Sequence, residues 1–415
     1  MRVLLVTDSY PPVVDGIATS VSALAVGLLE LGHEVLVVAP DPRGAPSGGV
    51  EVRGFPHFAL PGAGYPVVIA SARQYDRVVD RFSPDVVHVH TLAVLGMTAT
   101  NRSCSDGPPS VLTWHTDVLA YRQAYPLLRL VIPAVHLRWA LPGRRGDAVR
   151  DVLGMVLDGV LGRDVTPRQS EMLAVAVDRH HYVVAPSHKA AQRVPSLRGV
   201  PVDVVPSAVV ERAVSSCRNA STSRRAGKVI AFVGRPEPEK NFTALLEAMR
   251  RCVLPEHPDA VLAVVGRVRD HRRMRRALTM AEVGHAVRFL GVLPNSGIVP
   301  FLTRCRMLAL PSVTETQGLV LSEAALAGCP AVVMDAELDG LVQHERTGLV
   351  AETPAALGAA LVRLLDDPAL CEKLGSAARR AVVRYTHLDM ARGLVDIYTA
   401  VVAPSGHTAT DSTDR

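Results

Sequence analysis

The segment PSVTETQGLVLSEAALAGCP (311–330) carries more information about this protein than any other part of the chain. The apolar run MLAL (307–310) before it predicts a β-strand, and residues 319–327 predict a helix that the following Gly-Cys-Pro ends. Glu315 then lies in the turn after a strand, and Glu323 lies about one turn into the helix. The pattern therefore places two carboxylates on either side of one helix N-terminus.

Between the two glutamates, Gln317 and Gly318 keep the start of the helix free of bulky side chains. Unpaired N–H groups and the positive end of the helix dipole make such an N-terminus a site for phosphate. Each carboxylate can accept hydrogen bonds from a hydroxyl-rich group beside that phosphate. A nucleotide sugar, with its sugar, diphosphate and ribose, has this layout. An ordinary βα unit with solvated glutamates fits the spacing alone equally well.

The length of 415 residues is too great for one hydrophobic core and predicts two domains. In both halves, β-branched apolar runs alternate with helical patterns, which is typical of parallel sheets covered by helices. A polar stretch rich in Ser and Arg indicates the linker between the halves. We expect an α/β protein with an N-terminal domain over 1–205, a linker over 206–228, a C-terminal domain over 229–385, a helix over 386–402 and a disordered tail over 403–415.

The bulk composition excludes several classes of function. The net charge of +5 is small for this length and aromatic residues make up only 4%, so we expect no nucleic-acid partner. The six cysteines are scattered singly, which argues against structural zinc and for a reducing compartment. The first apolar run is too short for a signal peptide, and no apolar stretch is long enough to span a bilayer. We expect a cytoplasmic protein, at most peripheral to the inner face of the membrane.

Further segments follow in a fixed order on both sides of 311–330. They are VLLVTDSYPPVVDGIATSVSALAVGLLELGHEVLVVAP (3–40), DVVHVHT (85–91), VLTWHTD (111–117), VVAPSHKA (183–190), FVGRPEPEKNFTALLEAM (232–249), VRFLGVLP (287–294) and ERTGLVAE (345–352). In this order they resemble the retaining glycosyltransferases of family 4 over almost the whole chain. The resemblance implies the GT-B fold, in which two Rossmann-like domains face each other across a deep cleft. It also implies that the helix over 386–402 crosses back to the N-terminal domain.

The resemblance implies roles for four charged residues in the second half. Arg235 and Lys240 match the cations that clasp the nucleotide diphosphate, and such charges stabilise a leaving oxyanion without a metal ion. Glu315 matches the glutamate that contacts hydroxyls of the donor sugar, and Glu323 matches the one that binds the ribose. Backbone N–H groups after Glu315 are expected to hold further donor oxygens, and the donor-binding residues there are Thr316, Gln317, Gly318 and Leu319.

In the first half, Gly16 opens the backbone at a helix N-terminus, where a phosphate can approach. The family usually has Gly-Gly at this point, whereas this chain has Asp-Gly. His115 ends a predicted strand, and its counterpart in the family approaches the donor sugar at the reaction centre. Asp117 either orients the acceptor or caps the next segment. Tyr121 and Tyr125 are expected on the acceptor side.

The motif ETQG, in place of Glu-x-Phe-Gly, and the spaced tyrosines most resemble the diacylglycerol glycosyltransferase and α-mannosyltransferase branch. Residues 119–145 hold five arginines and no acidic residue, so this segment can lie on an anionic membrane and receive a lipid acceptor. It can also be an acceptor-side helix packed on its own domain. The same features occur in enzymes that modify soluble metabolites, so the acceptor is a hydroxyl compound that is either lipid-linked or soluble.

Three departures from the family pattern bear on the donor. VVPSAVV (204–210) replaces Pro-Asn-Gly-Val-Asp, and VVGRVRD (264–270) replaces Gly-x-Gly and puts Arg267 and Arg269 near the expected base. The stretch LDG (338–340) is only a weak match. These changes leave the base open, with a UDP-sugar favoured over a GDP-sugar. None removes a diphosphate contact and no Asp-x-Asp pair is present, so we expect neither a cofactor nor a metal ion.

The sequence therefore predicts a retaining, metal-independent glycosyltransferase of a bacterium, which moves a sugar from a nucleotide diphosphate to a hydroxyl acceptor. His88 and His90 are expected to line the core. A sugar-nucleotide epimerase of the same fold is an alternative, but the long insertion over 119–170 argues against it. A non-catalytic sugar-nucleotide-binding protein is another, and the intact pair of Arg235 and Lys240 argues against that.

Overall fold

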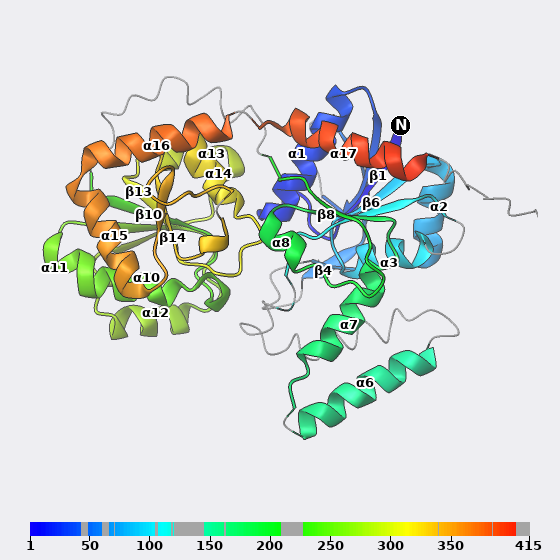
Figure 1. The fold of residues 1–415 in the computed structure, drawn as a ribbon, viewed down its shortest axis with the longest axis horizontal. Coiled ribbons are helices and arrows are strands. Elements are labelled where there is room, and N and C mark those ends of the chain that lie inside the picture. The colour runs from blue at the N-terminus through cyan, green and yellow to red at the C-terminus, as the bar shows by residue number, and fades with distance from the viewer. Residues whose placement is uncertain are drawn as a thin grey trace, which may run out of the picture.

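The computed structural model describes residues 1–42, 49–59, 66–69, 71–103, 107–117, 119, 145–161, 163–208, 227–338, 340–383 and 385–403 (Figure 1). The chain forms two α/β units that lie next to each other, each built on a parallel sheet. This arrangement confirms the predicted fold class of two Rossmann-like domains. The tail, most of the expected linker and most of the arginine-rich segment, with Tyr121 and Tyr125, lie outside the described residues.

The N-terminal domain is built on seven parallel strands in the order β3-β2-β1-β6-β7-β8-β9. The chain begins in the middle of the sheet and adds strands first on one side and then on the other, as in doubly wound folds. The strands are β1 (Arg2–Val6), β2 (Glu34–Pro40), β3 (Glu51–Phe55), β6 (Val86–Val89), β7 (Ser110–Thr113), β8 (Tyr182–Ala185) and β9 (Val202–Val204). A separate antiparallel ribbon joins β4 (His57–Ala59) to β5 (Pro66–Val68).

Helices cover both faces of this sheet. Along β1, Val3 and Leu5 pack with α1 and the C-terminal helix α17, whereas Leu4 and Val6 pack with α2 and α3 on the other face. This alternation follows from the two-residue repeat of a strand, and it explains why the strand is apolar throughout. The helices described in this domain are α1 (Gly16–Glu30), α2 (Ala72–Phe82), α3 (Val94–Ser103), α6 (Arg145–Val160), α7 (Thr166–Val177) and α8 (His188–Gln192).

The C-terminal domain is built on six parallel strands in the order β12-β11-β10-β13-β14-β15. They are β10 (Val229–Val233), β11 (Val261–Val265), β12 (Val287–Gly291), β13 (Met307–Leu310), β14 (Ala331–Val333) and β15 (Gly348–Val350). Its helical elements are η2 (Pro238–Lys240), α10 (Phe242–Ala248), η3 (Met249–Val253), α11 (Leu254–Glu256), α12 (His271–Met280), α13 (Asn295–Leu302), α14 (Leu319–Leu326), η4 (Ala336–Leu338), α15 (Pro354–Asp366) and α16 (Pro368–Val382).

The last helix, α17 (His387–Val402), packs against α1 of the N-terminal domain (Figure 1). The two helices approach closely at Gly27, where a Cβ atom would lie 2.7 Å from the backbone oxygen of His387 and 2.9 Å from the Cβ of Ala391. Farther along, the hydroxyl of Tyr398 lies 2.5 Å from Nδ1 of His88 in the sheet. Helix α17 is therefore part of the N-terminal core.

The two sheets place their polar loops at comparable points. In each sheet the first strand lies between two neighbours whose connections leave in opposite directions, β2 and β6 around β1, and β11 and β13 around β10. In open α/β sheets, ligands bind outside the carboxyl ends of the strands at such a switch point. The predicted site residues follow the carboxyl ends of β1, β7, β10 and β13.

Candidate active site

In the C-terminal domain, the loops after β10 and β13 meet because these strands are direct neighbours. Nζ of Lys240, at the end of η2, lies 2.5 Å from Oε1 of Glu315. The backbone oxygen of Glu239 accepts hydrogen bonds from the hydroxyls of Ser312 and Thr314, at 3.2 and 2.9 Å. The turn that carries Lys240 is thus fastened to the loop that carries Glu315, and two predicted catalytic residues lie in direct contact.

The ionisation of Glu315 follows from this contact. Burial raises the pKa of its carboxyl, but the Lys240 ammonium and hydrogen bonds from Lys240 and Ser312 outweigh burial and hold the pKa below its usual value. The more distant charge of Lys189 acts in the same direction. Glu315 is therefore a carboxylate at neutral pH, able to accept hydrogen bonds from sugar hydroxyls.

Arg235 is positioned by the crossing of two loops. Gly234 and Gly266 have positive φ angles of 142° and 151°, and a Cβ on Gly266 would lie 2.0 Å from the backbone oxygen of Gly234. Only glycine allows this approach. Nη2 of the half-buried Arg235 lies 3.5 Å from Oε1 of the buried Glu239. Arg267, on the second loop, is exposed.

The N-terminus of α14 lies directly after the Glu315 turn. Gly318 is its N-cap, with a φ of +75° that favours glycine, and no side chain among the described residues caps this helix. Leu319 is the first helical residue. The helix therefore presents an uncapped N-terminus beside Glu315 and Lys240, which suits a phosphate group.

Glu323 lies one turn farther along α14 and is half-buried. Burial raises the pKa of its carboxyl to about 8. No described residue donates a hydrogen bond to this carboxyl, so the side chain is largely protonated at neutral pH. The two glutamates of the motif therefore differ in charge, with Glu315 ionised and Glu323 mostly neutral.

Three histidines form a connected group at the carboxyl edge of the N-terminal sheet. Nε2 of His115 lies 3.1 Å from Nδ1 of His90. His88 contacts the hydroxyl of Thr113 at 2.7 Å. His88 and His90 are both buried in the domain, as predicted. Burial lowers the pKa of His115 to about 4, so its ring is neutral at physiological pH and acts as a hydrogen-bonding group rather than a cation.

Three predicted donor-binding residues contact the N-terminal domain directly. The hydroxyl of Thr316 donates to the backbone oxygen of His115 at 2.8 Å. The side-chain amide of Gln317 pairs with the backbone of Ser207 in both directions, each bond 2.9 Å long. The side chain of Leu319 lies 3.7 Å from the position that a Cβ on Gly16 would take. The structure thus brings Gly16, His115 and the loop after β13 together.

The contact of Gln317 gives a physical role to a departure from the family pattern. Ser207 belongs to the segment 204–210, which lacks the usual glycine and acid, and its hydroxyl also bonds to that of Ser20 at 2.9 Å. The unusual glutamine in ETQG therefore holds the backbone after β9 across the domain junction, whereas the hydroxyl of Ser207 bonds within the N-terminal domain.

Gly16 is the first residue of α1, and Asp15 before it caps the helix by accepting from the N–H of Ala18 at 2.8 Å. The hydroxyl of Ser9 donates to the same carboxyl at 2.5 Å. A carboxylate at a helix N-terminus repels a phosphate there. We therefore expect the diphosphate of a donor to rely on Arg235, Lys240 and α14 rather than on α1.

Asp117 is buried, and its Oδ2 lies 3.6 Å from Nη1 of Arg193 on α8. Asp117 therefore faces α8, and neither of its two predicted roles, orienting the acceptor or capping the next segment, is tested by this contact.

The sequence interpretation assigned no role to Ser187, Lys189 and Ser207, which also reach the C-terminal domain. The sequence feature that could have identified these three residues is their position just after the carboxyl ends of β8 and β9.

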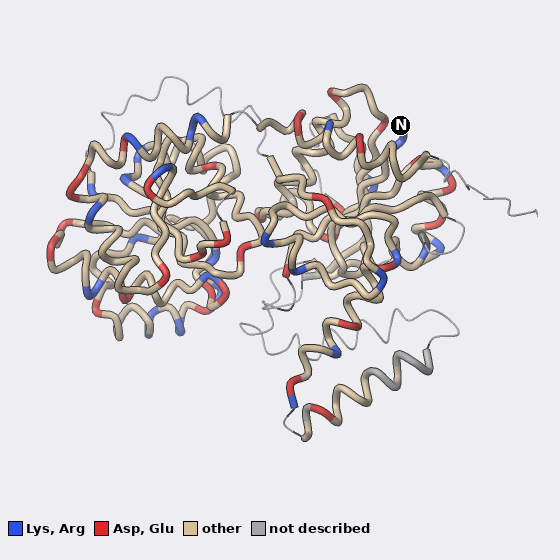
Figure 2. Tube along the Cα trace, in the orientation of Figure 1, with Lys and Arg blue, Asp and Glu red and all other residues tan. Residues whose placement is uncertain are grey.

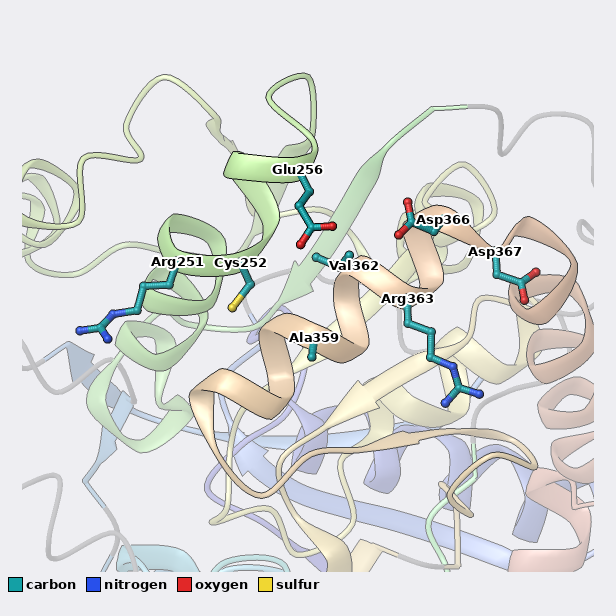
Figure 3. A pocket seen from close by; sticks show the side chains of 8 residues that line it. All are labelled: Arg251, Cys252, Glu256, Ala359, Val362, Arg363, Asp366 and Asp367. Carbon is teal, nitrogen blue, oxygen red and sulfur yellow. The ribbon is translucent and has the colours of Figure 1, made fainter.

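A surface hollow of about 750 Å³ lies elsewhere in the C-terminal domain, between the η3–α11 region and α15 (Figure 3). None of the predicted site residues lines it, so we assign it no part in the site. Its lining residues are Arg251, Cys252, Glu256, Ala359, Val362, Arg363, Asp366 and Asp367.

No group of three or more His, Cys, Asp and Glu side chains among the described residues is arranged to hold a metal ion. No described helix combines the length and apolar character needed to cross a membrane.

Two family models match the chain: Glycosyltransferase Family 4 over residues 14–149 and Glycosyl transferases group 1 over residues 216–381. A GDP-mannose-dependent alpha-mannosyltransferase of Mycolicibacterium smegmatis is 29% identical over 97% of this chain and 98% of its own length. An alpha-monoglucosyldiacylglycerol synthase of Acholeplasma laidlawii is 22% identical, again over 97% of this chain and 98% of its own.

Among solved structures, HepE of Anabaena in complex with UDP-glucose matches with a TM-score of 0.68 at 16% identity, over 96% of this chain and 100% of that one. This likeness concerns the fold. The two models cover one domain each, and the relatives include both kinds of enzyme in the predicted branch. The chain belongs to glycosyltransferase family 4 and is a glycosyltransferase with the GT-B fold.

Proposed function

We propose that this protein transfers a sugar from a nucleotide diphosphate to a hydroxyl acceptor with retention of the anomeric configuration. The observation that carries this proposal is the meeting of Lys240, Glu315 and the uncapped N-terminus of α14 at the switch point of the C-terminal sheet. This arrangement offers two cationic elements for a diphosphate beside one carboxylate for sugar hydroxyls.

In the proposed reaction, the bond between the anomeric carbon and the diphosphate oxygen breaks, and a bond from that carbon to the acceptor oxygen forms on the same face. The acceptor proton passes to an oxygen of the leaving phosphate, so no protein base is required. Arg235, Lys240 and the N–H groups of α14 stabilise the negative charge that develops on the diphosphate. Glu315 accepts hydrogen bonds from the donor sugar, and the neutral ring of His115 borders it from the other domain.

The donor is proposed to be a UDP-sugar. The named relatives point in two directions, because the mannosyltransferase uses GDP-mannose by its name whereas HepE was solved with UDP-glucose. Arg267 and Arg269 follow the carboxyl end of β11, the neighbour of β10, and are proposed to lie on the base side of the diphosphate. No metal ion is proposed to take part.

We expect UDP to raise the melting temperature of the protein, and to do so equally in EDTA, because side chains and a helix terminus hold the diphosphate. A thermal-shift screen of UDP, GDP and their sugars measures this without an acceptor. UMP serves as the control, since it lacks the second phosphate. Stabilisation by GDP alone would move the proposal to a GDP-sugar. Stabilisation by neither, or only with added Mg²⁺, would contradict the site.

The acceptor is proposed to be lipid-linked, with the protein peripheral to a membrane. Helix α6 stands off from the N-terminal domain, and one side of it packs on α7 through the buried Met155 (Figure 1). Its other side is an exposed apolar stripe, with Leu153 and Val160 exposed by 64% and 78%. The stripe consists of Val149, Leu153, Val156, Leu157 and Val160. Such a helix face can enter the boundary of a lipid layer.

We expect the protein to sediment with vesicles of anionic phospholipid, and the variant Leu153→Ser/Leu157→Ser to lose most of this binding. Met280→Ser, at a similarly exposed apolar residue on α12, is the matched control and should bind as the wild type does. A wild-type protein that stays in the supernatant would favour a soluble acceptor.

A further inference from the structure

Helix α8 lies at the junction of the two domains (Figure 1). It belongs to the N-terminal domain and follows β8, with Ser187 as its N-cap. Three of its polar groups reach the C-terminal domain, from Ser187, Lys189 and Arg193. Figure 2 shows basic and acidic residues together at this junction. The contacts of Ser187 and Lys189 reach the loop over 311–318, which is called the donor loop below because Glu315 lies in it, and that of Arg193 reaches Glu337.

The side chain of Lys189 is only 1% exposed, which is rare for a lysine. Its ammonium donates to the carboxylate of Asp335, which is 5% exposed, and to the backbone oxygen of Val313 at 3.0 Å. Oε2 of Glu337 lies 3.8 Å away. All these partners belong to the C-terminal domain. A buried ammonium must be paired, and here every partner among the described residues comes from the opposite domain.

The other two contacts of α8 support the same link. The hydroxyl of Ser187 donates to the backbone oxygen of Thr316. Arg193 bridges the domains between Glu337, at 2.5 Å, and Asp117, at 3.6 Å. The pair of Arg193 and Glu337 is much more exposed than that of Lys189, so water screens it and it holds the domains less firmly.

These contacts hold the donor loop on both sides of Glu315. Lys189 binds the carbonyl two residues before it, and Ser187 binds the carbonyl one residue after it. If the domains separated, Lys189 would lose these partners, and both its ammonium and the carboxylate of Asp335 would become exposed to water. We propose that Lys189 is a positioning residue, which fixes the donor loop through its buried ion pair with Asp335 and so couples the geometry around Glu315 to the closed arrangement of the domains.

This inference rests on the proposed function, because it takes the donor loop as the sugar site. A positioning role for Lys189 predicts that its loss impairs sugar transfer but leaves nucleoside diphosphate binding intact, whereas a merely structural role predicts that both are impaired. Nucleoside diphosphate binding uses Arg235, Lys240 and α14, all within the C-terminal domain, and does not need Lys189. Sugar transfer needs the donor loop to face His115, and this does require Lys189.

The test compares Lys189→Met with Lys228→Met. Lys228 also pairs with an aspartate, Asp259 at 2.7 Å, but on the surface of the C-terminal domain, so it is a matched control. Lys189→Met is expected to bind UDP within about twofold of the wild type, to lower the rate of UDP release from a UDP-sugar about tenfold or more, and to give a larger radius of gyration in X-ray scattering. Lys228→Met is expected to change none of the three.

A second variant tests whether the effects of Lys189→Met come from misfolding caused by the unpaired charge of Asp335. Lys189→Met/Asp335→Asn removes the unpaired charge as well, so it should fold as the wild type does and still scatter as a more open protein. The wild-type radius of gyration and rate in both variants would overturn the proposal, as would equal losses of UDP binding and rate. A wild-type protein that binds neither UDP nor GDP would overturn the proposed function instead, because the scattering comparison needs no ligand.

Discussion

Arg235→Ala and Lys240→Ala are each expected to lower the rate of sugar transfer about a hundredfold or more, while the domains stay folded. Both cations lie at the carboxyl end of β10, and the breaking glycosidic bond leaves negative charge on the diphosphate beside them. Loss of one oxyanion-stabilising group from an active site typically has an effect of this size. Turnover with a chosen donor, measured beside a thermal melt of each variant, gives the result.

The two variants should differ in their response to pH. The charge of Lys240 is the largest effect that opposes burial at Glu315. Removing Lys240 should therefore let the pKa of the Glu315 carboxyl rise. The residual rate of Lys240→Ala should therefore increase with pH as Glu315 ionises, whereas that of Arg235→Ala should not. Arg251→Ala, at an exposed cation beside the hollow that takes no part in the site, is the control and should keep most of the activity. Near wild-type rates in both main variants would place the diphosphate elsewhere.

The core of each domain could be predicted from the sequence because its strands are buried on both faces. Runs such as VLLV in β1 and VIAFV in β10 have no polar position, which is the mark of a central parallel strand. Of the four edge strands described in the two parallel sheets, β12 was predicted by the run VRFLG, whereas β3, β9 and β15 were not. In β3 the residues alternate between exposed and half-buried, and β9 and β15 are only three residues long, so none has an apolar run to detect.

The contacts between the domains could not be predicted in this way. Gln317 and Ser207 pair across 110 positions of sequence, and Lys189 reaches Val313 across 124. Such pairs depend on how two separately folded sheets face each other, which no local pattern records. The family resemblance placed Lys240 and Glu315 at one site but did not predict their direct contact, since the sequence alone does not state that β10 and β13 are neighbours.

The charge states of the two glutamates depend on burial and partners, which the spacing Glu-x7-Glu does not contain. Glu315 is ionised because Lys240 lies 2.5 Å away, and Glu323 is mostly neutral because burial acts on it without a described cationic partner. The family resemblance gave the two glutamates different partners, but neither it nor the spacing records that their charge states differ. The structure predicts that they will behave differently in binding experiments.

Glu323→Ala is expected to weaken the binding of UDP about ten- to hundredfold, because the ribose belongs to the diphosphate as well as to the donor. The estimate applies above the pKa of about 8, where Glu323 is ionised, and follows from a loss of roughly 1.5–3 kcal/mol for a hydrogen bond to a charged group. Glu315→Ala should bind UDP almost as the wild type does but transfer sugar much more slowly, since UDP carries no sugar for Glu315 to hold. Isothermal titration calorimetry with UDP, together with turnover, separates the two variants.

The pH dependence gives the comparison a second readout. Because the pKa of Glu323 is raised to about 8, the free protein must lose a proton before this carboxylate can accept hydrogen bonds from both ribose hydroxyls. The affinity for UDP should therefore rise as the pH approaches 8, and Glu323→Gln should remove that rise while keeping the shape of the side chain. In Glu315→Ala the rise should persist, because Glu315 is already ionised well below this range. Equal weakening of UDP binding in both alanine variants, with no change in its pH dependence, would mean that the two glutamates act together in holding the loop and α14 rather than on separate parts of the donor.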